Sequence, residues 1–197
     1  MRAVLPRYQA DTEHLREVFS YFPSGVVAVL AEIDGEPRGI VASAFTVGVS
    51  MDPPLVSCAV QNTSRTWPVL KCADTIGISV LAEDQGSLCR QLASPDRRAR
   101  FEHVPLRDTG SSALFISGAP VWFECTLAGE FPAGDHVVAL LEVHGLGADP
   151  GLNPLVFHGS SFRQLLLPST AVAPVPGQPG TRSQSAFDDT STPREGS

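Results

Sequence analysis

PVWFECTLAGEFPAGDHVVALLEVHGLGA, residues 120–148, contains two runs rich in valine, leucine and aromatic residues on either side of a short polar segment. The runs at 120–131 and 136–148 are typical of long strands, and PAGD at 132–135 has the turn-forming residues of a hairpin. A link this short joins antiparallel strands, because parallel strands need a crossover of a dozen or more residues. The sequence therefore predicts a long antiparallel hairpin here.

Shorter elements are predicted on both sides of this hairpin. Helical spacing predicts a helix at 11–22, capped by Asp11 or Thr12, and two shorter helices. The further predicted strands are 25–33, 40–51, 55–60, 75–81 and 154–158, with a turn at 34–39 and the shorter helices at 66–73 and 84–94. Residues 102–118 fit a strand or two with loop. Many strands in hairpins around one core favour a mainly β fold with a few helices, in which an antiparallel sheet closes into a barrel.

Composition limits the chain's partners and its compartment. A formal charge of −7 over 197 residues argues against nucleic-acid binding, which depends on cationic side chains. The N-terminus lacks a leader pattern, and the longest apolar run, at 26–31, is too short to cross a membrane. Four scattered cysteines predict buried free thiols in the cytoplasm, and the five histidines lack zinc spacing, so we expect no metal.

The last segment, 168–197, differs in composition from the rest. It is rich in Pro, Ser, Thr and Gly and has a single aromatic residue. Such a segment cannot bury enough apolar surface to offset its ordering entropy, so we expect a disordered tail after one domain at 1–167.

Three stretches could carry chemistry. In VASAFTVGVSM (41–51) apolar residues at 45, 47, 49 and 51 alternate with small ones at 42, 44, 46, 48 and 50. The small face would admit a flat ligand, or instead another backbone or a second subunit. In QNTSRTWP (61–68), hydroxyl and amide groups precede a helix, which suits a phosphate with Arg65 as counter-charge, or simply a helix cap. In PAGDHVV (132–138), His136 follows a turn at the start of a strand. It could take part in catalysis, although a single histidine in such a place is often structural or solvated instead.

Seven motifs occur in a recognisable order: VFSYFPSGVVAV (18–29), GIVASAFTVGVSMDPPLVS (39–57), NTSRTWPVL (62–70), RF (100–101), SGAPVWFEC (117–125), GDH (134–136) and PLVFHGSSF (154–162). With these motifs, the chain from about 13 to 166 resembles the flavin reductase-like family, the small reductase components of two-component flavin-dependent monooxygenases. The resemblance implies an FMN-binding split β-barrel, usually a homodimer with the flavin near the subunit interface.

The resemblance also assigns roles by position. Residues implied to line the flavin are Ser43, Ala44, Phe45 and Thr46, partly through backbone atoms, with Ser50 close by; those for the ribityl-phosphate end are Asn62, Ser64 and Thr66. Arg100 and Phe101 would lie near the bound nucleotides, and His136 would face the nicotinamide. The strand at 41–51 is one residue longer than the family's commonest form, which a bulge at Val47–Gly48 would absorb.

The implied activity is NAD(P)H:flavin oxidoreductase. A hydride would pass from NADH or NADPH to FMN, or to FAD, and the reduced flavin would supply a partner monooxygenase. Stacked rings need no nucleophile, so orientation would lower most of the barrier, and His136 would position the nicotinamide. Three alternatives stay open: a flavin carrier or sensor without turnover, a split-barrel oxidoreductase acting directly on an organic substrate, and a barrel without a ligand.

Overall fold

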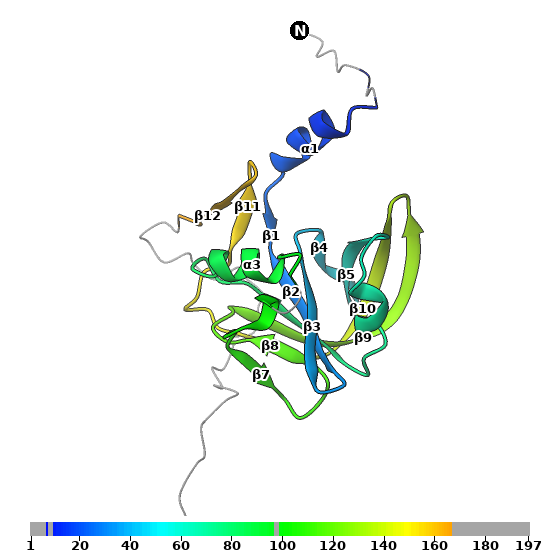
Figure 1. Ribbon diagram of the computed structural model, residues 1–197, viewed down its shortest axis with the longest axis vertical. Coiled ribbons are helices and arrows are strands. Elements are labelled where there is room, and N and C mark those ends of the chain that lie inside the picture. Colours follow the sequence, from blue (N-terminus) through cyan, green and yellow to red (C-terminus); the bar gives the residue numbers. More distant parts are fainter. Residues whose placement is uncertain (1–6, 8–9, 97–98, 167–197) are drawn as a thin grey trace, which may run out of the picture. The chain divides into compact units, whose positions relative to one another are not determined.

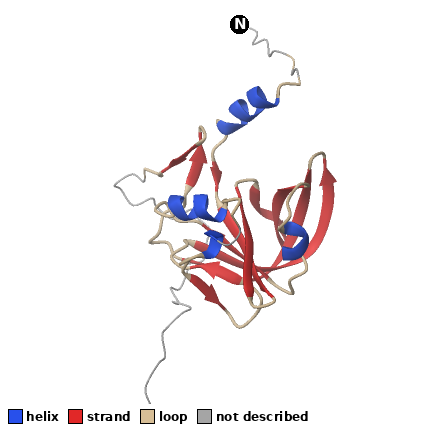
Figure 2. Ribbon diagram, in the orientation of Figure 1, coloured by secondary structure: helices blue, strands red, loops and turns tan. Residues whose placement is uncertain are grey.

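The structure is a computed structural model that describes residue 7, residues 10–96 and residues 99–166. Strands dominate, with three α-helices and one 3₁₀ turn among the described residues (Figures 1 and 2). In chain order the elements are α1 Thr12–Ser20, β1 Ser24–Gly25, β2 Val27–Ile33, β3 Glu36–Ala42, β4 Phe45–Met51, β5 Pro54–Gln61, α2 Trp67–Leu70, β6 Ile76–Val80, α3 Gly86–Leu92, η1 Ala99–Phe101, β7 Leu106–Asp108, β8 Leu114–Ile116, β9 Val121–Ala133, β10 His136–Ala148, β11 Val156–His158 and β12 Ser161–Arg163.

Seven strands form one antiparallel sheet in the order β3-β2-β6-β9-β10-β5-β4. The predicted long hairpin is confirmed as β9 and β10, which lie side by side in the sheet (Figure 1). Ala133 pairs with His136, so Gly134 and Asp135 make a two-residue turn, in which Gly134 adopts a φ of +66°. The described parts of β3 and β4 do not pair with each other, which leaves the sheet open, as a split barrel requires.

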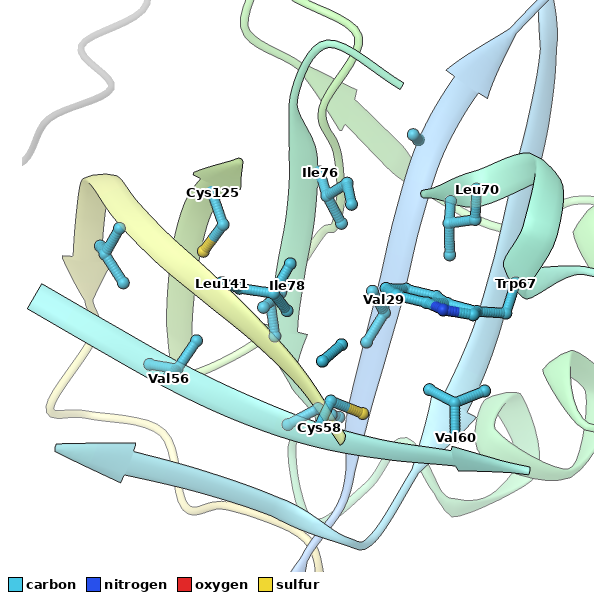
Figure 3. Close-up of a cluster of buried hydrophobic side chains, with 14 residues drawn as sticks. Val29, Val56, Cys58, Val60, Trp67, Leu70, Ile76, Ile78, Cys125 and Leu141 are labelled. Atoms are coloured by element: carbon cyan, nitrogen blue, oxygen red, sulfur yellow. The ribbon is translucent and has the colours of Figure 1, made fainter. Parts of the chain in front are cut away.

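The apolar strand β2 separates two hydrophobic cores. Val27, Val29 and Ala31 face the core shown in Figure 3, and Ala28 and Leu30 face the second core. Both faces of β2 are therefore buried, which explains its unbroken apolar sequence. β5 instead alternates, and its buried residues all face the first core; they are Val56, Cys58 and Val60.

A close crossing of β6 and β8 joins the sheet to the small sheet formed by β7 and β8. Gly77 on β6 lies under the backbone of Leu114 on β8, and a Cβ at Gly77 would stand less than 3.0 Å from three backbone atoms of Leu114. Two residues further along β6, the buried Ser79 Oγ accepts a hydrogen bond of 2.9 Å from the Ile116 N–H. Gly77 thus permits the close crossing, and the hydrogen bond of Ser79 fixes it. The strands predicted within 102–118 are confirmed as β7 and β8.

The predicted strand at 40–51 is wrong as a single strand. β3 starts earlier, at Glu36, because the turn is only Asp34 and Gly35, which adopt φ values of 55° and 74°. β3 then ends at Ala42, and β4 begins at Phe45. The hairpin of β2 and β3 is confirmed, with a shorter turn than predicted.

The predicted bulge is confirmed, but the predicted apolar face packs in the core only at Phe45. The register of β4 against β5 shifts between Thr46 and Ser50, and Gly48 within this shift has a φ of +69°. Phe45, ahead of the bulge, packs against the first core, whereas the rest of this face of the edge strand β4 is exposed. Its exposed residues are Val47, Val49 and Met51.

The cysteine prediction is correct for three of the four thiols. Burial raises the pKa of Cys58 to about 12, and burial with the nearby Glu124 charge raises that of Cys125 to about 12; burial also raises the pKa of Cys89. Cys72 is exposed instead, because α2 ends at Leu70, short of the predicted 66–73. No cysteine is paired in a disulfide.

Two further predictions meet the structure only in part. The N-terminal helix is confirmed, and the Asp11 carboxylate caps it by accepting hydrogen bonds from two backbone N–H groups. The tail over 168–197 lies outside the described residues, and the domain boundary at 167 stays a prediction. Within the described part of the chain, no helix is long and apolar enough to cross a membrane.

Candidate functional site

A cleft of about 760 Å³ opens where β3, β5 and the loop before α2 come together. Its walls come from four places: the end of β3 and its link to β4, the end of β5 with the loop to α2, the segment after α3, and the start of β10. The lining residues are Ile40, Val41, Ala42, Ser43, Ala44, Ala59, Val60, Gln61, Thr63, Ser64, Arg65, Thr66, Ala93, Pro95, Arg100 and His136. This volume lies in the usual range for small-molecule and cofactor sites.

Small residues at the break between β3 and β4 form one wall of the cleft. Ala42, Ser43 and Ala44 line it, and the Ala44 carbonyl accepts a hydrogen bond of 2.9 Å from the Ala59 N–H of β5. With no bulky side chain over this stretch, a flat ligand can approach the main chain closely. The small face of the sequence pattern therefore contributes to the cleft only at Ala42 and Ala44, since its later residues are not in the lining.

The loop at 62–66 is tied to the β9–β10 turn. The Asn62 backbone N–H donates to the Asp135 carbonyl (3.0 Å), and its side-chain Nδ2 donates to the Gly134 carbonyl (3.1 Å). Ser64 Oγ accepts from the N–H of Trp67, the first residue of α2 (3.2 Å), so it caps a backbone donor there although the N-cap position itself is Thr66, which makes no side-chain capping bond. A hydroxyl has a donor and a second lone pair left, so capping does not remove Ser64 from the cleft.

A buried tryptophan holds α2, and with it this loop, against β9. The Trp67 indole lies in the first core (Figure 3), and its Nε1 donates to Glu130 Oε1 at 2.7 Å. Lys71 Nζ lies 2.6 Å from Glu130 Oε2. These hydrogen bonds, first from Lys71 and then from Trp67, hold the pKa of Glu130 below its ordinary value. One carboxylate thus links both ends of α2 to the sheet.

Glu130→Gln is expected to lower the free energy of unfolding by about 1–2 kcal/mol at neutral pH, because a hydrogen bond to a charged group is replaced by a neutral one. The lowered pKa means that the ionised Glu130 stabilises the fold above the unfolded-state value of about 4.3, and this contribution is lost as pH falls through the folded-state pKa. Denaturant unfolding should therefore give a difference that shrinks in acid. Glu17→Gln, at an exposed ion pair, is the control, and an equal loss in both variants would contradict the role of Glu130.

Arginine side chains give the cleft its charge. Arg100 Nε donates to the Ser94 carbonyl at 2.5 Å, and its terminal nitrogen Nη1 donates to Thr66 Oγ1 at 3.4 Å. Arg65 has no hydrogen-bond or ion-pair partner among the described residues. Among the described residues, no aspartate or glutamate lines the cleft, although the chain has 21 of them. The cleft is therefore suited to an anionic group at its Arg100 end.

His136 stands at another part of the cleft, at the first residue of β10. Its Nδ1 lies 2.8 Å from Asp135 Oδ1, and this hydrogen bond, with the imidazole charge, holds the pKa of Asp135 below its ordinary value. An ionised carboxylate only accepts, so the Nδ1 nitrogen carries the hydrogen. The Nε2 nitrogen is then available to a ligand as an acceptor in the neutral ring, or as a donor in the charged ring.

The structure brings together six of the eleven residues predicted for the site: Ser43, Ala44, Ser64, Thr66, Arg100 and His136. The others lie outside the lining. Phe45 packs against Phe123 in the first core, with ring centroids 6.2 Å apart, and Thr46 and Ser50 pair with β5 on either side of the bulge. Asn62 supports the loop, and Phe101 lines a smaller adjoining pocket. The flavin and nicotinamide roles of all eleven stay predictions.

Sequence reasoning missed most of the apolar lining and the support beneath it. Ile40, Val41 and Val60 are ordinary strand residues whose place at the cleft depends on where β3 and β5 end. Glu130 lies 63 residues from Trp67, and no local pattern connects them. The only available signal was position, because ligand-binding residues often follow strand ends.

An open antiparallel barrel with a cationic cleft between strand ends defines a class of small cofactor-binding barrels. Comparison with known proteins identifies the family: residues 19–166 match the flavin reductase like domain, and the chain belongs to this family. The resemblance found in the sequence and the predicted mainly β, antiparallel split-barrel fold are thereby confirmed.

Three similar proteins illustrate the match. An NADH-dependent flavin reductase of Rhodococcus is 38% identical over 164 residues, covering 78% of this chain and 86% of the relative. The reductase component of 4-hydroxyphenylacetate 3-monooxygenase of Thermus thermophilus is 33% identical, covering 80% and 99%. The solved structure of an NADH:FAD oxidoreductase of Streptomyces globisporus superimposes with a TM-score of 0.76 at 32% identity, covering 84% of this chain and all of that one.

Proposed function

We propose that this chain is an NAD(P)H-dependent flavin reductase that transfers a hydride from NADH or NADPH to FMN or FAD. The observation that carries the proposal is the cleft itself, which combines a wall of small residues with Arg100 and His136 and has no carboxylate among the described residues of its lining. The residues present fit a flavin, which is planar at one end and anionic at the other. Relatives named as flavin reductases support the same activity.

Each wall of the cleft then has a role. Ser43 and Ala44 present backbone to the isoalloxazine, and Phe45 and Thr46 continue the same main chain. Ser64, Thr66 and Arg100 bind the phosphate, with Asn62 holding their loop in place. Ser50 lies beyond the bulge, where it would affect flavin binding only indirectly, by helping to set the path of β4. The arrangement offers charge-assisted hydrogen bonds at the phosphate end and van der Waals contact at the ring end.

The chemistry belongs to the bound molecules, since a flavin accepts a hydride directly from a nicotinamide stacked on it. The protein contributes orientation, which can lower a barrier by up to roughly 7–11 kcal/mol when the reactants are well placed. His136, fixed by Asp135, holds the nicotinamide amide through Nε2. No residue of the cleft needs to act as a nucleophile.

One spectrophotometric experiment tests the proposal against its alternatives. The purified chain is mixed with NADH or NADPH, with and without FMN or FAD, and the loss of NAD(P)H absorbance is followed. Turnover that requires added flavin marks the flavin as a substrate, and turnover without it marks a bound cofactor. Flavin binding without NAD(P)H oxidation in any combination would favour a carrier or sensor and would end the reductase proposal. Oxidation only in the presence of an organic acceptor would favour the direct oxidoreductase.

His136→Ala is expected to raise the KM for the nicotinamide cofactor by about tenfold, the usual effect of losing one good hydrogen bond. The Kd for flavin should change little, because the phosphate contacts proposed above come from Ser64, Thr66 and Arg100 and not from His136. Steady-state kinetics and a flavin titration measure the two effects. His144→Ala, on the same strand but bonded to Thr126 outside the cleft, is the matched control. Unchanged kinetics in His136→Ala would remove this residue from the site.

The proposal extends to two partners. A flavin-dependent monooxygenase would receive the reduced flavin, as the name of the Thermus relative describes for that protein. A second copy of this chain would cover the edge strand β4, where Val47, Val49 and Met51 expose apolar side chains that an isolated barrel leaves in water. A monomeric mass by light scattering would contradict the homodimer.

A further inference from the structure

A second, smaller pocket of about 170 Å³ adjoins the phosphate end of the cleft. The two cavities share Arg65, Thr66 and Arg100 in their walls. The pocket is below the size of a site for a whole cofactor, so it can take one ring system or one further group of a ligand. A molecule that passes the shared wall would therefore reach both cavities.

The smaller pocket concentrates positive charge. Arg38 from β3 joins Arg65 and Arg100 in its lining, and no aspartate or glutamate of the described segments lines it. Arg38 is bound by the Glu36 carboxylate at 2.6 Å through one nitrogen, which leaves its other N–H groups for a ligand. Three arginines around one small cavity are notable in a chain with a net charge of −7. Such a pocket favours an anionic occupant.

The remaining walls are apolar and one is aromatic. Phe101 on η1 approaches β3 at Gly39, where a Cβ would lie 3.3 Å from the phenyl Cζ. Pro37 and Val69 complete the apolar lining. An aromatic face with guanidinium groups beside it is a good surface for a nucleobase, which stacks on both.

The position of the pocket decides which ligand can use it. His136 and Gln61 line only the cleft, whereas two of the three shared residues, Thr66 and Arg100, are ones that we assign to the flavin phosphate. We assign the ring end, beside His136, to the nicotinamide, and the group that extends past the phosphate end to the flavin. FMN ends at this phosphate. FAD continues through a second phosphate to adenosine.

We propose that the smaller pocket binds the adenine ring of FAD, with the second phosphate at the wall shared with the cleft, and makes this chain selective for FAD over FMN. Arg38 contacts the second phosphate, and the adenine stacks on Phe101. This inference rests on the proposed function, because it takes its direction from the flavin's place in the cleft. Arg38 is then a specificity-determining residue that the reduction of FMN does not need.

The test measures flavin binding without turnover. Isothermal titration with oxidised FAD and FMN should give a lower Kd for FAD in the unchanged protein. Arg38→Ala should raise the Kd for FAD about tenfold, as expected for one charge-assisted hydrogen bond, and leave that for FMN within about twofold. Val69→Trp, which fills the pocket from α2, should do the same if Arg38→Ala proves unstable. Arg163→Ala, an exposed arginine outside both cavities, is the control.

Each result bears on the proposal. Equal Kd values for the two flavins, or a parallel loss for both in Arg38→Ala, would overturn it. A rise in the KM for NADH or NADPH with no change in FAD binding would assign the pocket to the nicotinamide cofactor and would also overturn it. Selective loss of FAD binding in a chain that oxidises no NAD(P)H would uphold the pocket and end the reductase proposal, so the two failures are distinguishable.

Discussion

Arg100→Ala is expected to weaken flavin binding by about 10- to 100-fold, because charge-assisted hydrogen bonds to a phosphate are among the stronger polar contacts in proteins. The guanidinium is held in place by the Ser94 carbonyl and reaches Thr66, so it needs no reorganisation to meet an anion. The effect should fall on the KM for flavin, with the rate at saturating flavin changed much less, because Arg100 lies at the phosphate end. Titration and steady-state kinetics measure both quantities.

Two further variants separate binding from local structure. Arg100→Lys keeps the charge but loses the planar fork, so its flavin affinity should fall between those of the unchanged protein and Arg100→Ala. Thr66→Val removes the hydroxyl that Arg100 contacts and leaves the Ser94 link intact. Arg16→Ala, an exposed position on α1, should bind flavin normally. Flavin affinity that is unchanged in Arg100→Ala would place the phosphate elsewhere.

Gly77→Ala is expected to destabilise the fold by about 3 kcal/mol or more, at the upper end of what overpacking costs. The added methyl would lie less than 3.0 Å from the carbonyl oxygen and two further backbone atoms of Leu114. Backbone cannot rotate away as a side-chain end can, so β8 would have to leave β6. The hydrogen bond from the Ile116 N–H to Ser79 would be lost with it.

Equilibrium unfolding in denaturant measures the effect, with Gly129→Ala as the matched control. Gly129 is also a strand glycine, but a methyl group added there would have its nearest neighbouring atom 3.8 Å away, which is ordinary contact. A loss of stability in Gly77→Ala no larger than in Gly129→Ala would mean that the crossing of β6 and β8 can open without cost.

The parts of the fold that depend on local pattern could be predicted from sequence. The hairpin of β9 and β10 follows from two β-rich runs and a turn, and the bulge at Gly48 follows from one extra residue. The break at Ser43 and Ala44 is not predicted, because Ser43 is the one exception to the apolar alternation and a single polar residue does not by itself end a strand. The exposure of Val49 likewise depends on the position of β4 at the edge of the sheet. Alternation of apolar and small residues does not indicate that position.

The candidate site likewise has a part that could be predicted from the sequence and a part that could not. The order of short motifs locates Ser43, Ser64, Arg100 and His136, which the structure gathers at one cleft. The smaller pocket could not be predicted, because the sequence places Arg38 in a turn, and only the approach of η1 to β3 gives it a ligand-binding position. Contacts between residues far apart in the chain decide these features, and such contacts cannot be read from the local pattern of a single sequence.

Because three of its four cysteines are buried, the chain has one exposed thiol that can be labelled. Thiol reagents attack the thiolate, and Cys58 and Cys125 are both shielded and poorly ionised. Cys72 is the exposed one of the four, directly after the helix that follows the cleft loop. A maleimide dye should therefore label the folded protein at one position without mutagenesis. That dye would report ligand binding through its fluorescence, in a chain whose every other residue is unaltered.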